Sequence, residues 1–254
     1  MIARELKEKL HREEPQIGTF TKLADATALE VLGGAGMDFA IIDMEHAPCD
    51  RMLLLDLIRA ADSVGLPTIV RVPECTEAQI LNALDLGASG VQLPGLSTVE
   101  EVAEALRYTK YAPLGQRGLS FSQRSAGYGL LDKDAYMADS NAGLINVVHI
   151  ENQAMAKQVD QLCAMDAIDV LFIGPMDISQ SLGHPGQPGH PEVQAVVDEI
   201  IRSCTAHHKP FGIFVGTAEA ARKYLDKGAS YVAIGSDLAF MRQGFQAVRR
   251  QLEA

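Results

Sequence analysis

Residues 145–177 read INVVHIENQAMAKQVDQLCAMDAIDVLFIGPMD, and this stretch is the clearest sign of the architecture. Its two apolar runs, 145–150 and 170–173, are nearly continuous, as in parallel strands that are covered on both faces. The segment between them is long enough for a helical crossover, so the stretch predicts a β-α-β unit. Glu151 and Asp177 follow the two runs, and we therefore expect them at neighbouring strand ends.

The same unit recurs along the chain. Further apolar runs predict strands at 16–20, 39–43, 68–72, 90–93, 211–215 and 231–234. Amphipathic segments, several closed by glycine, predict helices at 28–36, 51–65, 77–87, 98–111, 191–208, 218–228 and 236–252. Eight strands alternating with helices indicate an α/β protein, a (β/α)8 TIM barrel that occupies residues 1–254 as a single domain.

Two segments interrupt this pattern. Residues 113–128, PLGQRGLSFSQRSAGY, show no clear period, and a long irregular loop in a compact domain usually has a function. Residues 183–191, GHPGQPGHP, predict an exposed connection rich in turns. The β/α pattern resumes after each segment, so neither is expected to link two domains.

The charge of the chain restricts its partners. The 254 residues include 22 Lys plus Arg and 33 Asp plus Glu, a formal net charge of −11, which disfavours binding to nucleic acid or an anionic membrane. The beginning, MIARELKEKLHREEPQ, lacks the apolar segment of a signal peptide, and no long apolar run follows. The four cysteines lack the spacing of a zinc site. We expect a soluble cytoplasmic protein with reduced cysteines.

Catalytic groups of a parallel barrel lie at the carboxyl ends of its strands. Two carboxylates there, Glu151 and Asp177, suit a hard divalent ion such as Mg²⁺ or Mn²⁺. The alternative is a salt bridge for one of them and a helix cap for the other. The turn that starts at Gly174 also places the backbone N–H groups of Met176 and Asp177 at a helix start, where they can hold a carboxylate.

Two other strand ends carry polar residues. Asp43 and His46 predict a carboxylate–imidazole pair with His46 as a proton shuttle, unless the two residues only cap a loop and a helix. Arg71 lies in the apolar run TIVRVP and requires an anion. That anion is either a substrate group or a carboxylate of Asp43, Glu45 or Glu74. No lysine ends a strand in the central region, which argues against Schiff-base chemistry.

Together these segments resemble the HpcH/HpaI family of metal-dependent class II pyruvate aldolases, which includes 4-hydroxy-2-oxoheptanedioate aldolase and 2-keto-3-deoxy sugar acid aldolases. The similarity covers nearly the whole chain, residues 17–238. It is carried, in order, by DFAIIDMEHAP (38–48), IVRVP (69–73), YAPLGQRG (111–118), VHIEN (148–152), FIGPMDIS (172–179) and ARKYLDKGASYVAIGSD (221–237).

The resemblance implies an activity. The implied protein is a divalent-metal-dependent aldolase that cleaves or forms 4-hydroxy-2-oxo acids through a metal-bound pyruvate enolate, giving pyruvate and an aldehyde. The implied metal is Mg²⁺, Mn²⁺ or Co²⁺. The implied assembly is a homo-oligomer, a trimer or hexamer, with the last helix exchanged between subunits.

The resemblance also implies roles for individual residues. Glu151 and Asp177 match the metal ligands, and Arg71 matches the arginine on the 2-oxo oxygen of pyruvate. The amides of Met176 and Asp177, in the turn from Gly174, match the groups that bind the pyruvate carboxylate.

Three further positions match the family. His46, paired with Asp43, matches the acid/base for the aldol hydroxyl proton, and Asp85 matches a residue that reaches a neighbouring subunit's site. The chain departs from the well-known aldolases at His149, which replaces a glutamine near the substrate, and at Thr19-Phe20, which replaces Leu-Trp. These departures leave the identity of the acceptor open.

Two other functions remain possible from the sequence. Within the broad family, a citrate synthase of siderophore biosynthesis condenses oxaloacetate with acetyl-CoA, and Arg117 and Arg124 in the irregular loop would suit a polyanionic substrate. The second alternative is a non-catalytic barrel that binds a 2-oxo acid or a metal without turnover.

Overall fold

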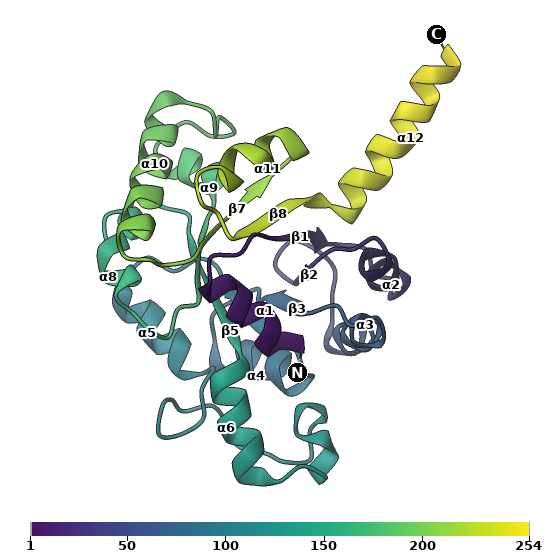
Figure 1. The fold of residues 1–254 in the computed structure, drawn as a ribbon, viewed down its shortest axis with the longest axis vertical. Coiled ribbons are helices and arrows are strands. Elements are labelled where there is room, and N and C mark those ends of the chain that lie inside the picture. The colour runs from purple at the N-terminus through teal and green to yellow at the C-terminus, as the bar shows by residue number, and fades with distance from the viewer. Residues whose placement is uncertain (1, 254) are drawn as a thin grey trace.

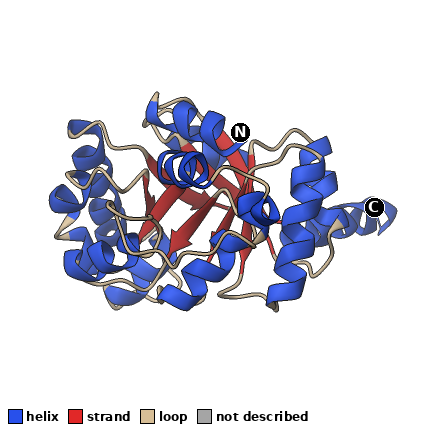
Figure 2. Cartoon of the chain, turned by 90° about the horizontal axis from the view of Figure 1, so that it is seen from below, coloured by secondary structure: helices blue, strands red, loops and turns tan. Residues whose placement is uncertain are grey.

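The computed structural model describes residues 2–253 as a closed barrel of eight parallel strands in the order β1 to β8. Neighbouring strands pair in parallel, and β8 closes the barrel against β1. Figure 2 shows the strands enclosed by helices. The predicted α/β class and TIM-barrel architecture are confirmed. The strands are β1 Gln16–Thr21, β2 Phe39–Asp43, β3 Thr68–Arg71, β4 Gly90–Leu93, β5 Ile145–Ile150, β6 Val170–Ile173, β7 Phe211–Val215 and β8 Tyr231–Ser236.

The strand predictions were accurate in place and nearly so in length. The predicted bounds of β2, β4, β5, β6 and β7 match the structure. β1 and β8 run one and two residues further than predicted, to Thr21 and Ser236, and β3 ends one residue earlier, at Arg71. Differences of this size are usual at element ends, where hydrogen bonding frays.

The seven predicted amphipathic helices are all present, as α2, α3, α4, α5, α10, α11 and α12. Side-chain caps start several of them: Asp50 accepts hydrogen bonds from two amides of α3, and Thr98 forms a capping box with Glu101 at α5. The helices are α1 Ile2–His11, α2 Thr27–Gly34, α3 Arg51–Ser63, α4 Glu77–Asp85, α5 Val99–Arg107, the 3₁₀ helix η1 Arg124–Gly129, α6 Lys133–Gly143, α7 Gln153–Ala156, α8 Val159–Cys163, α9 Pro175–Ser181, α10 Pro191–Ala206, α11 Ala218–Leu225 and α12 Asp237–Glu253.

Apolar residues form one layer between the strands and the helices and a second layer inside the barrel. The inner layer includes Phe39 and Tyr231, whose rings stack at 4.1 Å. Gly18 is required beside them, because a Cβ at this position would overlap the ring of Phe39. Leu6 and Leu10 of α1 join this inner cluster, so α1 packs against the barrel (Figure 1).

The last helix, α12, extends away from the barrel (Figure 1). None of its described residues is buried. Its large apolar side chains are exposed: Leu238, Phe240, Met241, Phe245, Val248 and Leu252. Within residues 2–253, no helix combines the length and the apolar character needed to cross a membrane.

Candidate active site

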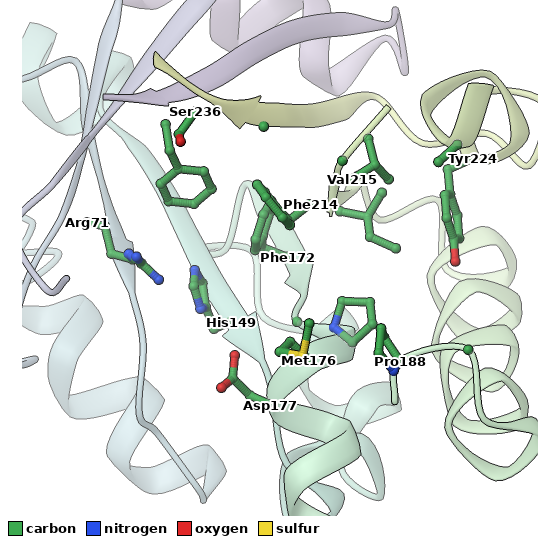
Figure 3. A pocket seen from close by; sticks show the side chains of 18 of the residues that line it. Arg71, His149, Phe172, Met176, Asp177, Pro188, Phe214, Val215, Tyr224 and Ser236 are labelled. Atoms are coloured by element: carbon green, nitrogen blue, oxygen red, sulfur yellow. The ribbon is translucent and has the colours of Figure 1, made fainter. Parts of the chain in front are cut away.

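The carboxyl ends of the strands surround a cavity of about 970 Å³, and a smaller cavity of about 320 Å³ adjoins it. Predicted site residues line one or both: His46, Arg71, His149, Glu151, Gly174, Met176 and Asp177. Figure 3 shows several of them facing the larger cavity. Asp43 is buried at the end of β2, and Asp85 lies elsewhere in the fold. The structure thus brings together side chains from β2, β3, β5 and α9.

Asp43 and Arg71 form a bidentate ion pair. Nε and Nη2 of Arg71 donate to the two carboxylate oxygens of Asp43 at 3.0 and 2.7 Å. Nη1 of Arg71 lies 3.0 Å from Oε2 of Glu45. Burial opposes ionisation of Asp43, but the Arg71 guanidinium, the Lys22 ammonium and the His46 amide together outweigh it and lower the pKa of the carboxyl from 3.8 to about 2. Two of the three carboxylates foreseen for Arg71 as the alternative to a substrate anion, Asp43 and Glu45, are therefore its partners, and Glu74 is not among them.

Lys22 is a site residue that the sequence analysis missed. It directly follows β1, lines the large cavity, and its Nζ lies 3.0 Å from Oδ2 of Asp43. Its position directly after β1 is the signal in the sequence, whereas the expectation of no strand-end lysine concerns only the central region. The ion pair holds Lys22 as a second cation beside Arg71.

The predicted pairing of the Asp43 carboxylate with the His46 ring is wrong for this structure. Oδ1 of Asp43 accepts from the backbone N–H of His46 at 3.1 Å, not from its imidazole. The imidazole is exposed, and its Nε2 lies 3.8 Å from Oε2 of Glu45. The reason is competition, because Arg71 and Lys22 already occupy the carboxylate. The His46 ring nevertheless faces both cavities.

His149 occupies the centre of a buried chain of hydrogen bonds. The Tyr231 hydroxyl donates to Oε1 of Gln92 at 3.2 Å, and Nε2 of Gln92 lies 2.5 Å from Nε2 of His149. Since the Gln92 amide nitrogen is the donor in this orientation, the proton of a neutral His149 is on Nδ1, which donates to Oε2 of Glu151 at 2.8 Å. Neither Gln92 nor Tyr231 was foreseen, because each lies within an apolar run, in β4 and at the start of β8, and not at the carboxyl end of a strand.

The Glu151 carboxylate is held on both oxygens. Oε2 accepts from His149, and Oε1 accepts from the backbone N–H of Gly95. Burial raises the pKa of Glu151. The hydrogen bonds from His149 and Gly95 and the nearby charge of Arg71 lower it by more than burial raises it, so the net pKa is below the usual value. Glu151 is therefore kept ionised at the cavity wall.

Asp177 lies beside Glu151 but has the opposite electrostatics. Burial, and then the charge of Glu151, raise the pKa of its carboxyl. Its oxygens accept no hydrogen bond from any residue of the described chain. A Cβ on Gly174 would lie 3.1 Å from Cβ of Glu151 and 3.6 Å from Oδ2 of Asp177, so this glycine lets the two acidic residues approach. Two adjacent carboxylates, one without a partner, fit the oxygen ligands of a divalent cation.

The amides proposed to bind a carboxylate lie in the first turn of α9, which starts at Pro175 with Gly174 as its N-cap. N–H groups in a first helical turn have no helical acceptor. Those of Met176 and Asp177 are therefore available, and both residues line the large cavity.

Asp85 and the irregular loop lie outside this site. Asp85 ends α4, at the opposite end of the barrel, and its Oδ1 accepts from Nη2 of the buried Arg117 at 2.9 Å. Arg124 pairs with Asp62 and donates to the carbonyl oxygen of Leu86 at 2.9 Å. Both loop arginines therefore bind groups of their own chain and are not anion ligands of this cavity.

The two cysteines nearest the site are poor nucleophiles. Burial raises the pKa of Cys49 to about 11 and that of Cys75 to about 12. Neither thiol is ionised near neutral pH.

Known proteins share both sequence and fold with this chain. Residues 16–243 match the family described as HpcH/HpaI aldolase/citrate lyase. A 5-keto-4-deoxy-D-glucarate aldolase of Salmonella arizonae is 38% identical over 240 residues, which cover 94% of this chain and 93% of that protein.

Solved structures show the same relationship. An HpcH/HpaI aldolase/citrate lyase family protein from Burkholderia cenocepacia J2315 has a TM-score of 0.94 at 30% identity, covering 99% of this chain and 100% of that one. The citrate synthase SbnG has a TM-score of 0.87 at 29% identity, covering 98% and 97%. The chain therefore belongs to the HpcH/HpaI aldolase/citrate lyase family and is a carbon–carbon lyase, as its sequence predicted.

Proposed function

We propose that this protein is a divalent-metal-dependent aldolase that cleaves or forms 4-hydroxy-2-oxo acids through the enolate of pyruvate. Cleavage gives pyruvate and an aldehyde, and condensation joins them. The observation that carries the proposal is the placement of the Glu151 and Asp177 carboxylates in one cavity with the Arg71 guanidinium. The name of the 5-keto-4-deoxy-D-glucarate aldolase relatives supports the reaction type.

Glu151 and Asp177 would hold the cation, for which Mg²⁺, Mn²⁺ or Co²⁺ are the candidates. When bound, such an ion supplies Lewis-acid stabilisation of the negative charge that develops on the 2-oxo oxygen. Arg71 adds to this stabilisation from the protein. Its contacts with Asp43 and Glu45 use three of its five N–H groups, so one remains on each terminal nitrogen for a substrate oxygen.

The substrate carboxylate is assigned to the amides of Met176 and Asp177, where the helix start favours an anion. His46 is assigned the proton of the 4-hydroxyl group. Its ring is exposed to both cavities and is not committed to Asp43, so it is free to take a proton in cleavage and return it in condensation. His149 faces the same cavity and orients Glu151.

We also propose that the protein is a homo-oligomer, a trimer or hexamer, in which α12 packs against another copy. A helix without a buried residue and with a row of exposed apolar side chains is unstable alone in water. Asp85 is proposed to reach a neighbouring subunit's site, since it lies away from the site of its own chain.

A second candidate is condensation of oxaloacetate with acetyl-CoA, favoured by the similarity to the citrate synthase SbnG. The deciding experiment is pyruvate release from a panel of 4-hydroxy-2-oxo acids after chelator treatment, with and without added Mg²⁺ or Mn²⁺. Metal-dependent release is the expected result. CoA release from oxaloacetate and acetyl-CoA, with no release of pyruvate, would overturn the aldolase proposal.

A further inference from the structure

The large cavity has two chemically different ends (Figure 3). Arg71, His149 and Asp177 lie at one end. The side chains that continue toward the other end are apolar: Met176, Phe172, Phe214, Val215 and Pro188. At about 970 Å³, the cavity is near the upper limit of roughly 300–1,000 Å³ for small-molecule sites, so there is room beyond a three-carbon acid.

Two of these apolar side chains are unusually exposed for residues in a barrel mouth. Met176 is 53% and Phe214 is 43% exposed, whereas Phe20 and Phe172 behind them are buried. Phe214 is held edge-to-face against Phe20, with ring centroids 5.7 Å apart. When an apolar ligand covers apolar surface that faces a cavity, the free energy of the system falls, which favours binding.

Few polar side chains reach the apolar end. One of them, Gln194, donates from Nε2 to the Pro188 carbonyl at 2.8 Å. Lys223 and the Tyr224 side chain lie at the far rim. Beside Met176 and Phe214, a substrate hydroxyl group would exchange its hydrogen bonds to water for contact with apolar side chains.

The far wall of the cavity is held in place by its own contacts. Pro188 and Gly189 belong to the 183–191 loop. At its ends, Nε2 of His184 lies 2.8 Å from Oε2 of Glu192, and the rings of His184 and His190 stack at 3.6 Å. The apolar end is therefore formed before a ligand enters.

We propose that the aldehyde partner of this enzyme carries an apolar branched-alkyl or aryl tail, which the Met176 and Phe214 side chains bind, and not a polyhydroxylated tail. The inference rests on the aldolase function proposed above. It separates this chain in substrate class from its sugar-acid relatives.

The test compares two aldehydes of the same shape in condensation with pyruvate. In 2-methylbutanal, methyl groups replace the two hydroxyl groups of glyceraldehyde. We expect kcat/KM for 2-methylbutanal to exceed that for glyceraldehyde by about 10-fold or more, the usual effect of one or two apolar groups in a matched pocket. A ratio at or below one would overturn the inference.

Side-chain variants tie the preference to this end of the cavity. Met176→Ser keeps the backbone amide and should lower the ratio of the two kcat/KM values by about 10-fold. Phe214→Ser should act in the same direction. Met52→Ser on α3, where the methionine is 66% exposed and outside the cavity, is the matched control and should leave the ratio unchanged. Aldehyde hydration affects all variants equally, so it cancels in this comparison. An unchanged ratio in Met176→Ser would refute the assignment.

Exchange of pyruvate methyl protons in D₂O, followed by NMR, separates the two proposals because it needs no aldehyde. Without metal-dependent exchange, the proposed function fails. With exchange and a preference for glyceraldehyde, only the apolar tail is refuted.

Discussion

Nδ1 of His149 lies 2.8 Å from Oε2 of Glu151, so the residue that departs from the usual glutamine is hydrogen-bonded directly to a proposed metal ligand. Gln92 fixes this arrangement from the other side of the ring. The position of the carboxylate therefore depends on a side chain on β4 that has no contact with the cavity.

Gln92→Leu should weaken the binding of Mn²⁺ by about 10- to 100-fold, the usual cost of losing a group that orients a metal ligand. The variant leaves Nε2 of His149 without its donor, so the ring no longer holds Glu151 in one orientation. Titration followed by electron paramagnetic resonance measures the affinity, and ¹⁵N NMR reports the His149 tautomer. Tyr231→Phe, which removes only the hydroxyl group at the end of the chain, should have a smaller effect. Unchanged affinity and tautomer in Gln92→Leu would contradict this role.

Glu151→Gln should abolish binding of the divalent cation and aldolase activity while the fold stays intact, because the amide keeps the shape but removes the charge. Isothermal titration with Mn²⁺ and the circular dichroism spectrum check both parts. Glu219→Gln, at an exposed position of α11, is the control. A Glu151→Gln variant with normal metal affinity would show that the ligand assignment is wrong.

His46→Ala should lower kcat for cleavage by about 100- to 10,000-fold, the usual cost of a lost acid/base group. Pyruvate and metal affinity should be unchanged, since the ring is assigned only the hydroxyl proton. Steady-state kinetics and pyruvate binding measured on the same preparation test this split. Equal losses in affinity and rate would indicate a binding role instead.

Ionised Asp43 should stabilise the fold at neutral pH. Its pKa is about 2 in the folded protein and 3.8 ordinarily, so the contribution is complete above about pH 4 and is lost as the pH falls toward 2. The difference corresponds to about 2 kcal/mol. The gap in unfolding free energy between wild type and Asp43→Asn should therefore narrow by this amount from pH 4 to pH 2. Asp56→Asn on the surface should show no such change, and a constant gap for Asp43→Asn would contradict the assignment.

Phe245→Asp combined with Val248→Asp should dissociate the proposed oligomer, because two charges would enter the apolar row of α12. Light scattering coupled to size-exclusion chromatography gives the mass. Gln243→Asp with Gln246→Asp adds the same charge at the same spacing on polar positions and should leave the mass unchanged. A monomeric wild type would refute the oligomer outright.

The barrel and the carboxylate pair were predictable because both follow from local pattern and strand order. Apolar runs of strand length recurred between amphipathic helices, and parallel strands end at one edge, so Glu151 and Asp177 had to be neighbours. Arg71 was predictable for a different reason, since a permanent charge in an apolar strand requires an anion.

The contacts within the site were decided only by the tertiary structure. The choice between Arg71 and the His46 ring as partner of Asp43 depends on the β2–β3 register, which sets Asp43 opposite Arg71. The approach of Lys22, Gln92 and Tyr231 depends on closure of β8 against β1 and on which strand faces point inward.

The sequence by itself determined the fold class, the family and the candidate site residues, because these depend on residue type and on order along the chain. Only the tertiary structure decided which charges are paired, which histidine nitrogen bears the proton, and that the cavity continues into an apolar end. Those properties arise from distances between residues far apart in the chain, and no local pattern encodes them.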